Sequence, residues 1–138
     1  MLDRTDPRYA NVSDRLEHDV VAWLGTVRAD GRPHMVAVWF LWRPESGTVL
    51  VFSKPGQQKV RNIERNPNVV LSLDDTDDGE DPVTFDGRAE LLNDPAVSTT
   101  LEAYVAKYGK RIQSIGLDPA SMAALYSQAI LITPTKFY

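Results

Sequence analysis

The chain has 138 residues, which suits one domain. Its net charge of −4 argues against a nucleic-acid partner, since domains that bind nucleic acid are usually basic. It contains no cysteine, which excludes disulfides, thiolate zinc sites, iron–sulfur clusters and a cysteine nucleophile.

The amino-terminal segment is polar, and we interpret residues 1–13 as an arm that precedes a domain over residues 14–138. The arm lacks the apolar run of a signal peptide, and no stretch reaches the roughly 18 apolar residues of a membrane span. The sequence therefore predicts a cytoplasmic protein with no membrane partner. A short helix over 15–20, with Ser13 as its N-cap, is expected to begin the domain.

Three strands are expected in the first half of the chain. Residues 20–27 are rich in β-branched and aromatic side chains and end before Asp30-Gly31, a dipeptide typical of a hairpin turn. Further strands are predicted over 33–42 and 48–53. Because short turns join neighbouring strands, the sheet is predicted to be antiparallel.

The second half mixes helices and strands. Val60 and Ile63 share one face of a predicted helix, and Asp94 and Asp118, each followed by proline, are expected to cap two more helices. The elements expected here are helices over 57–65, 95–108 (ended by Gly109) and 120–125, and strands over 68–73, 83–92 and 128–133, the last ended by Pro134. Six short strands in so small a chain favour a closed sheet, so we predict a mainly β fold, a six-stranded antiparallel β-barrel with helices.

No catalytic constellation is recognisable. His18 and His34 are far apart and form no metal-binding spacing, and the acidic run 74–81 fails as an EF-hand because Phe85 stands where a glutamate is needed. Glycine-rich phosphate-binding motifs are absent. We therefore assign no catalytic residue and no metal ligand.

The cations around the predicted helix 57–65 suggest an anion site. Lys54, Lys59 and Arg61 gather there, with no acid before Glu64. A helix N-terminus already carries partial positive charge and unpaired N–H groups, so added cations are unfavourable unless an anion such as phosphate binds among them. A solvated basic helix is the alternative, and the local excess of positive charge in an acidic protein favours the anion site.

Residues 36–42 are apolar almost throughout, which indicates that both faces of this strand are covered. One face would fill the barrel. The other would meet a helix, a second chain or a flat ligand, and a core joined to a dimer interface would also explain the pattern.

In their order and spacing, these pieces resemble the pyridoxamine-phosphate-oxidase-like split-barrel flavoproteins, and within them the deazaflavin (F420)-dependent oxidoreductases. The segments that carry the resemblance are 24–34, 38–42, 53–55, 59–67, 87–91 and 132–136.

The resemblance implies a homodimer of FMN-binding split-barrel type, with two cofactor sites across the subunit interface. In such proteins the segment matching Met35 to Trp39 lies along the tricyclic ring, a segment matching Ser53 to Asn62 binds the phosphate, and Lys136 matches a basic position that approaches from the other chain. The residues assigned to the cofactor are Met35, Val36, Ala37, Val38, Trp39, Phe52, Ser53, Lys54, Lys59, Arg61, Asn62 and Lys136.

The implied function is an F420-dependent oxidoreductase that transfers a hydride between the deazaflavin and an unsaturated small organic substrate. Three alternatives stay open: an FMN-dependent oxidase or reductase, a non-catalytic protein that holds flavin, deazaflavin or tetrapyrrole, and a structural dimer without a cofactor. A shared fold does not decide among them.

Overall fold

A computed structural model describes residues 5–9 and 11–138 of the chain. The helical elements are η1 (Pro7–Tyr9), α1 (Val12–His18), α2 (Gln58–Arg65), α3 (Glu102–Ser114) and α4 (Pro119–Leu125). The strands are β1 (Val21–Val27), β2 (Pro33–Trp39), β3 (Leu41–Arg43), β4 (Thr48–Ser53), β5 (Asn68–Leu73), β6 (Thr84–Leu92) and β7 (Gln128–Phe137).

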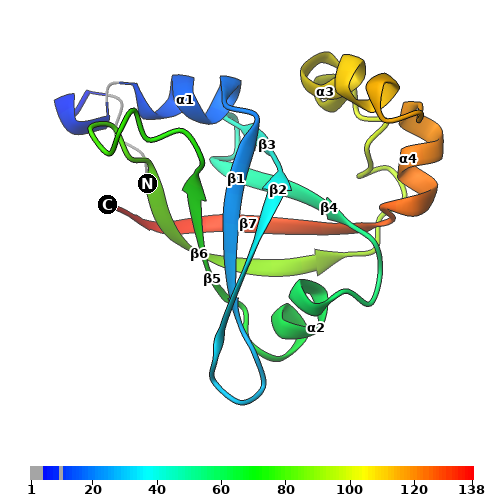
Figure 1. Ribbon diagram of the computed structural model, residues 1–138, viewed down its shortest axis with the longest axis horizontal. Helices are drawn as coiled ribbons and strands as arrows, with labels where there is room; N and C mark the ends of the chain where they lie inside the picture. Colours follow the sequence, from blue (N-terminus) through cyan, green and yellow to red (C-terminus); the bar gives the residue numbers. More distant parts are fainter. Residues whose placement is uncertain (1–4, 10) are drawn as a thin grey trace.

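Within the described residues, all the strands form one antiparallel sheet of seven, in the order β2-β1-β5-β6-β7-β4-β3. The first and last strands of this order, β2 and β3, are separated along the chain by Phe40 alone. The sheet must therefore curl until its two ends meet, and Figure 1 shows the strands wrapped in this way. The predicted antiparallel barrel is confirmed, with seven strands instead of six because the expected strand 33–42 breaks at Phe40.

Side chains of α3 hold the break at Phe40. The Tyr108 hydroxyl accepts a hydrogen bond from Phe40 N–H at 2.9 Å and donates to the Val20 carbonyl at 2.6 Å. The ammonium of Lys107 donates to the Phe40 carbonyl at 2.9 Å. Both peptide groups of Phe40 are therefore paired although this residue belongs to neither strand, which is what a buried backbone requires.

Two apolar clusters stabilise the fold. The larger one fills the barrel with inward residues such as Leu24, Leu71 and Ile132. The second joins α3 and α4 to the outside of β3, β4 and β7, and it is built around Tyr104 and Tyr108. In Figure 1 these two helices lie at one end of the barrel, while α2 lies beside the β1–β2 hairpin.

Two helix starts differ from the prediction. Helix α1 begins at Val12 rather than residue 15, so Ser13 lies inside it; Val12 and Leu16, one turn apart, are both buried. The helix expected at Pro95 begins at Glu102 instead. The reason is local: the Asp94 carboxylate accepts from Ala96 N–H at 3.0 Å and closes a turn of its own.

Two ends also differ. Helix α3 continues past Gly109 to Ser114. Strand β7 continues through Pro134 to Phe137, because the register slips between Asp86 and Gly87 at this point and a proline is tolerated at such an irregularity. The start of α4 is confirmed, with the Asp118 carboxylate accepting from Ser121 N–H at 2.8 Å.

The boundary between arm and domain stays a prediction, since residues 1–4 and 10 lie outside the described residues. The ring of Tyr9, within the expected arm, lies 6.2 Å from the ring of Phe137. Across residues 5–9 and 11–138, no helix combines the length and apolar character needed to cross a bilayer.

Candidate functional site

A cavity of about 200 Å³, which we name the β2–α3 cavity, lies where the barrel meets the helices. It brings together five of the predicted cofactor residues, from β2, β4 and α2. They are Ala37, Val38, Trp39, Phe52 and Lys59.

The start of α2 has the features expected of an anion site. Gln57, at the N-cap position, makes no side-chain cap, and the first turn contains no acid. The half-buried Lys59 ammonium donates to the Gln57 side-chain oxygen at 2.7 Å, and burial lowers the pKa of Lys59. Ser53 is buried beside them, with its hydroxyl donating to the Lys54 carbonyl at 2.8 Å. The helix therefore offers unpaired first-turn N–H groups next to a partly desolvated cation.

Lys54 and Arg61, the other two cations of the predicted anion site, are more exposed than Lys59. Lys54 is exposed, but its ammonium lies 5.5 Å from the ring centre of Tyr126, which lines the cavity. Arg61 is exposed and donates to the Gln58 side chain at 3.0 Å. Lys54 and Lys59 thus border the cavity, whereas Arg61 faces solvent one turn into α2.

Asn62 is buried inside the wall. Its amide N–H donates to the Thr26 hydroxyl at 2.9 Å, and its amide oxygen accepts from Gln58 at 2.7 Å. Because Asn62 is fully buried and bonds to Thr26 and Gln58, it positions α2 against β1.

Strand β2 alternates in burial within the single chain, so the expected cover of its second face, by a second chain or a flat ligand, stays a prediction. Val36 and Val38 pack on the barrel core, whereas Ala37 is exposed and Met35 is 57 % exposed. Trp23 of β1, 40 % exposed, lies opposite Ala37 in the register. A single chain therefore leaves one apolar face of β1 and β2 open. Across the break, Leu41 and Trp42 of β3 are both buried.

Lys136 lies far from the cavity within one chain. Gln128, at the start of β7, pairs with Ser53 near the cavity, while Lys136 is exposed and pairs with Asp86. Eight residues of strand separate Gln128 from Lys136, roughly 26 Å at about 3.3 Å per residue. This lysine can meet a ligand of the cavity only if a second chain brings it there.

The helices α3 and α4 supply cavity residues that the sequence did not reveal. Tyr104, Ile115, Met122 and Tyr126 complete the lining. An aromatic stack accompanies them: the Trp39 and Tyr108 rings lie 4.8 Å apart and 7° from parallel, and the Tyr104 ring meets Phe52 edge-on at 5.0 Å. The available signal was the spacing of Tyr104 and Tyr108, which places both on one helix face.

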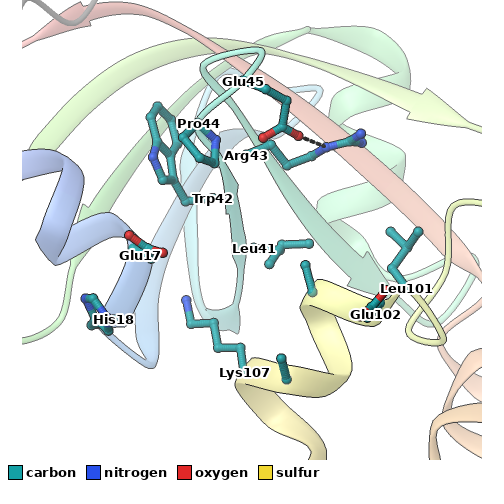
Figure 2. A pocket seen from close by; sticks show the side chains of 12 residues that line it. Glu17, His18, Leu41, Trp42, Arg43, Pro44, Glu45, Leu101, Glu102 and Lys107 are labelled. Carbon is teal, nitrogen blue, oxygen red and sulfur yellow. Dashed lines mark hydrogen bonds and ion pairs between the residues drawn. The ribbon is translucent and has the colours of Figure 1, made fainter.

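A larger cavity, of about 830 Å³, lies between α1, β3 and α3 and contains none of the predicted site residues. Figure 2 shows Lys107 reaching from α3 into the space between α1 and β3, with Glu17 and Trp42 on the far side. The Lys107 ammonium lies 3.8 Å from the ring centre of Phe40, and burial lowers the pKa of Lys107 to about 8.

This pKa predicts a pH-dependent stability. A lysine in the unfolded chain titrates near 10.4, so the unfolded state holds the Lys107 proton between about pH 8 and 10.4 where the folded state releases it. The contribution of Lys107 to the free energy of unfolding therefore rises with pH across that window. We expect a rise of about 1 kcal/mol, since partial exposure reduces the full effect. Urea denaturation of the wild type and of Lys107→Met at pH 7.5 and at pH 10 gives the free energy of unfolding at each pH. From the lower to the higher pH, this free energy should change by about 1 kcal/mol more favourably in the wild type than in the variant. The same change in both proteins would contradict the prediction.

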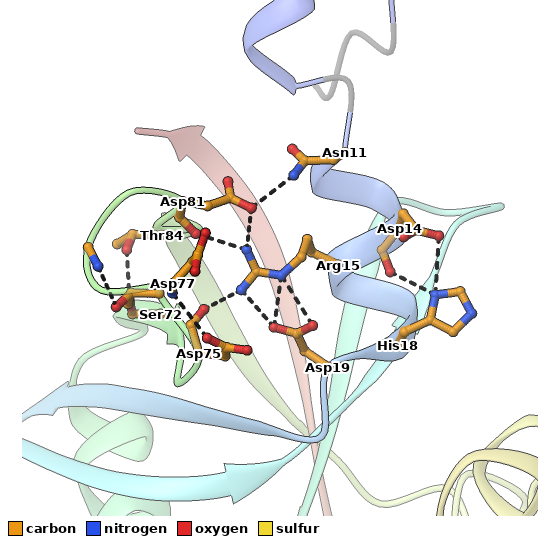
Figure 3. Close-up of polar contacts among 12 residues, drawn as sticks. Asn11, Asp14, Arg15, His18, Asp19, Ser72, Asp75, Asp77, Asp81 and Thr84 are labelled. Atoms are coloured by element: carbon orange, nitrogen blue, oxygen red, sulfur yellow. Dashed lines mark hydrogen bonds and ion pairs between the residues drawn. The ribbon is translucent and has the colours of Figure 1, made fainter.

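The acidic run 74–81 is tied to α1. Figure 3 shows the Arg15 guanidinium between Asp19 and Asp81, each at 2.8 Å, with a further hydrogen bond to the Asp75 carbonyl. His18 instead contacts Asp14 of its own helix. Over the part of the chain that the structure describes, no three carboxylates or histidines are arranged to hold a metal ion.

The fold and the site together define a split β-barrel in which an uncapped helix start with a half-buried lysine adjoins an aromatic cavity. The family model described as "Pyridoxamine 5'-phosphate oxidase" matches residues 10–138. The chain belongs to this family, and the resemblance inferred from the sequence is confirmed.

Two similar proteins are named as reductases, and both names contain F420. The chain is 34 % identical over 107 residues to an F420H(2)-dependent biliverdin reductase of Mycobacterium tuberculosis (strain CDC 1551 / Oshkosh), covering 71 % of this chain and 76 % of the relative. A solved structure named F420 Reductase is similar with a TM-score of 0.66 and 29 % identity, covering 91 % of this chain and 94 % of that one. A conserved hypothetical protein of Mycobacterium tuberculosis shares the fold with a TM-score of 0.70 at 23 % identity, covering 93 % and 81 %.

Proposed function

We propose that this protein is an oxidoreductase that uses coenzyme F420 and transfers a hydride between the deazaflavin and an unsaturated small organic substrate. The observation that carries the proposal is the half-buried Lys59, held by one hydrogen bond to Gln57 beside the uncapped start of α2. A desolvated cation without a carboxylate partner favours an anionic ligand. Family membership and two relatives named as F420 enzymes support the choice of cofactor.

The residues present fit such a cofactor. Lys59, Lys54 and the first-turn N–H groups of α2 would hold its phosphate, with Ser53 supporting the loop before the helix. Ala37, Val38, Trp39 and Phe52 would lie along the ring. When bound, the deazaflavin supplies the hydride chemistry, while the chain binds it, orients it and keeps water from its ring.

We propose further that the active form is a homodimer with cofactor sites at the interface. A cavity of about 200 Å³ is below the roughly 300–1,000 Å³ of typical ligand sites, so one chain would enclose part of the cofactor. The open apolar face around Trp23, Met35 and Ala37, which continues into a shallow hollow of about 470 Å³, is suited to a second copy. Such a copy could also bring Lys136 to the site. A cytoplasmic location stays a prediction.

The test is a titration of the purified protein with F420 and with FMN, in which binding is measured by the quenching of tryptophan fluorescence. We expect F420 to bind more tightly, and reduced F420 to be oxidised when an acceptor is added. Biliverdin, named in the mycobacterial relative, is the first acceptor to try. Preference for FMN would move the protein to the flavin-dependent class. Tight F420 binding without turnover over a broad acceptor panel would indicate a cofactor-holding protein instead.

A further inference from the structure

We propose that the phenolic hydroxyl of Tyr104 donates a hydrogen bond to a conjugated carbonyl oxygen of the flat ligand that occupies the β2–α3 cavity. This inference rests on the proposed function, which places the cofactor ring and its acceptor in that cavity. It adds a residue of α3 to the site, whose predicted residues in this cavity come from β2, β4 and α2.

The Tyr104 hydroxyl is a polar group that the described part of the protein leaves without a hydrogen bond. Tyr104 is 1 % exposed and lines the cavity, yet its hydroxyl makes no hydrogen bond to any side chain or backbone group of residues 5–9 and 11–138. Among the described residues, the fully enclosed side-chain polar atoms without a partner are His34 Nδ1 and Trp42 Nε1, so the Tyr104 hydroxyl reaches the open space of the cavity instead of being sealed in the core. An unpaired hydroxyl at a cavity wall is therefore available to a ligand.

Tyr108 provides the comparison on the same helix. It lies one turn further along α3, is equally buried, and its hydroxyl is fully used by Phe40 and Val20. The Tyr104 ring packs between Phe52, edge-on at 5.0 Å, and Tyr108, at 4.9 Å. These contacts fix the ring, so its hydroxyl is held in one place at the cavity although it makes no hydrogen bond to the described part of the protein.

The lining identifies the ligand chemistry. Besides Tyr104, the polar side-chain groups of the lining residues are the Lys59 ammonium, the Tyr126 hydroxyl and the Trp39 indole N–H, and none of the nine lining residues carries a carboxylate or a side-chain amide. Burial and the neighbouring tyrosines raise the pKa of Tyr104, so it remains a protonated donor at neutral pH. Donors without strong acceptors, set among aromatic walls, suit a flat molecule with exposed carbonyl oxygens.

Two sources share this chemistry: the carbonyls of the deazaflavin ring and those of a quinone-like acceptor. The test is Tyr104→Phe, which removes one oxygen and keeps the ring. We expect the Kd for oxidised F420 to rise about 5–20-fold if the cofactor is the acceptor of the bond. If Kd is unchanged and the KM for menadione rises by a similar factor, the bond is made to the hydride acceptor. Either result supports the proposal.

A readout on the free protein separates this role from a structural one. Because the hydroxyl has no partner in the ligand-free chain, the thermal midpoint of Tyr104→Phe should equal or exceed that of the wild type. The control is Thr99→Val, which removes a buried hydroxyl that donates to the Pro119 carbonyl at 2.8 Å. We expect that control to lower the midpoint and leave the Kd for F420 unchanged.

Two results would overturn the inference: wild-type Kd and KM in Tyr104→Phe, or a lowered midpoint with unchanged binding. Either would leave the proposed function standing as long as the wild type binds F420. Failure of the wild type to bind F420 and FMN would remove the proposed function and this inference together.

Discussion

Replacing Lys59 by alanine is expected to weaken F420 binding by about 1–3 kcal/mol, roughly 5–150-fold in Kd, which is the scale of a hydrogen bond to a charged group. The ammonium is half-buried, its pKa is lowered by that burial, and among the described residues its one hydrogen bond is to the uncharged side chain of Gln57. A phosphate arriving at the start of α2 would give this charge the counterion that it lacks. Fluorescence titration at fixed ionic strength measures the change.

The stability of the same variant should be almost unchanged, because removing a partly desolvated charge offsets the loss of its aliphatic contacts. Arg61→Ala is the matched control. It removes a cation from the next part of α2, where the side chain is exposed and bonded to Gln58, and it should change Kd less than threefold, as expected for a screened surface charge. Equal effects of the two substitutions would show that general positive charge, and not the geometry around Lys59, attracts the cofactor.

The β-strands were predictable because their signals are local. The strands expected over 48–53 and 68–73 coincide with β4 and β5 at both ends, where alternation or apolar runs stop at turn residues. The start of α3 had no such signal. Its N-cap position is Leu101, which cannot cap with its side chain, while the strong start signal at Asp94 was used by a turn.

The break at Phe40 could not be predicted, because its cause lies 68 residues further along the chain at Tyr108. The residues of the site likewise fall into those that a local sequence pattern reveals and those that long-range packing places. Lys54 and Lys59 were found from a local charge pattern, whereas Tyr104 and Tyr126 reach the cavity only through the packing of α3 and α4 on the barrel. The place of Lys136 depends on a second chain, about which one sequence contains no direct signal.

This dependence of β2 and β3 on α3 leads to the second large effect. Tyr108→Phe is expected to lower the free energy of unfolding by about 2–3 kcal/mol, because it leaves the Phe40 N–H buried without a partner. The Val20 carbonyl also loses its 2.6 Å hydrogen bond from this hydroxyl. Urea denaturation followed by far-UV circular dichroism measures the change.

Tyr104→Phe makes the same chemical change one turn earlier in α3, at a hydroxyl without a partner among the described residues, and should not lower stability. The difference between the two variants therefore isolates the hydrogen bonds at Phe40 from the packing of the rings. Since the Tyr108 ring also stacks on Trp39, loosening of the β2–β3 corner should carry over to the cavity wall and weaken F420 binding in Tyr108→Phe. If that variant were as stable as the wild type, the hydrogen bonds of the Tyr108 hydroxyl would add nothing to the joint at Phe40, which would then be held by the Lys107 hydrogen bond and by apolar packing.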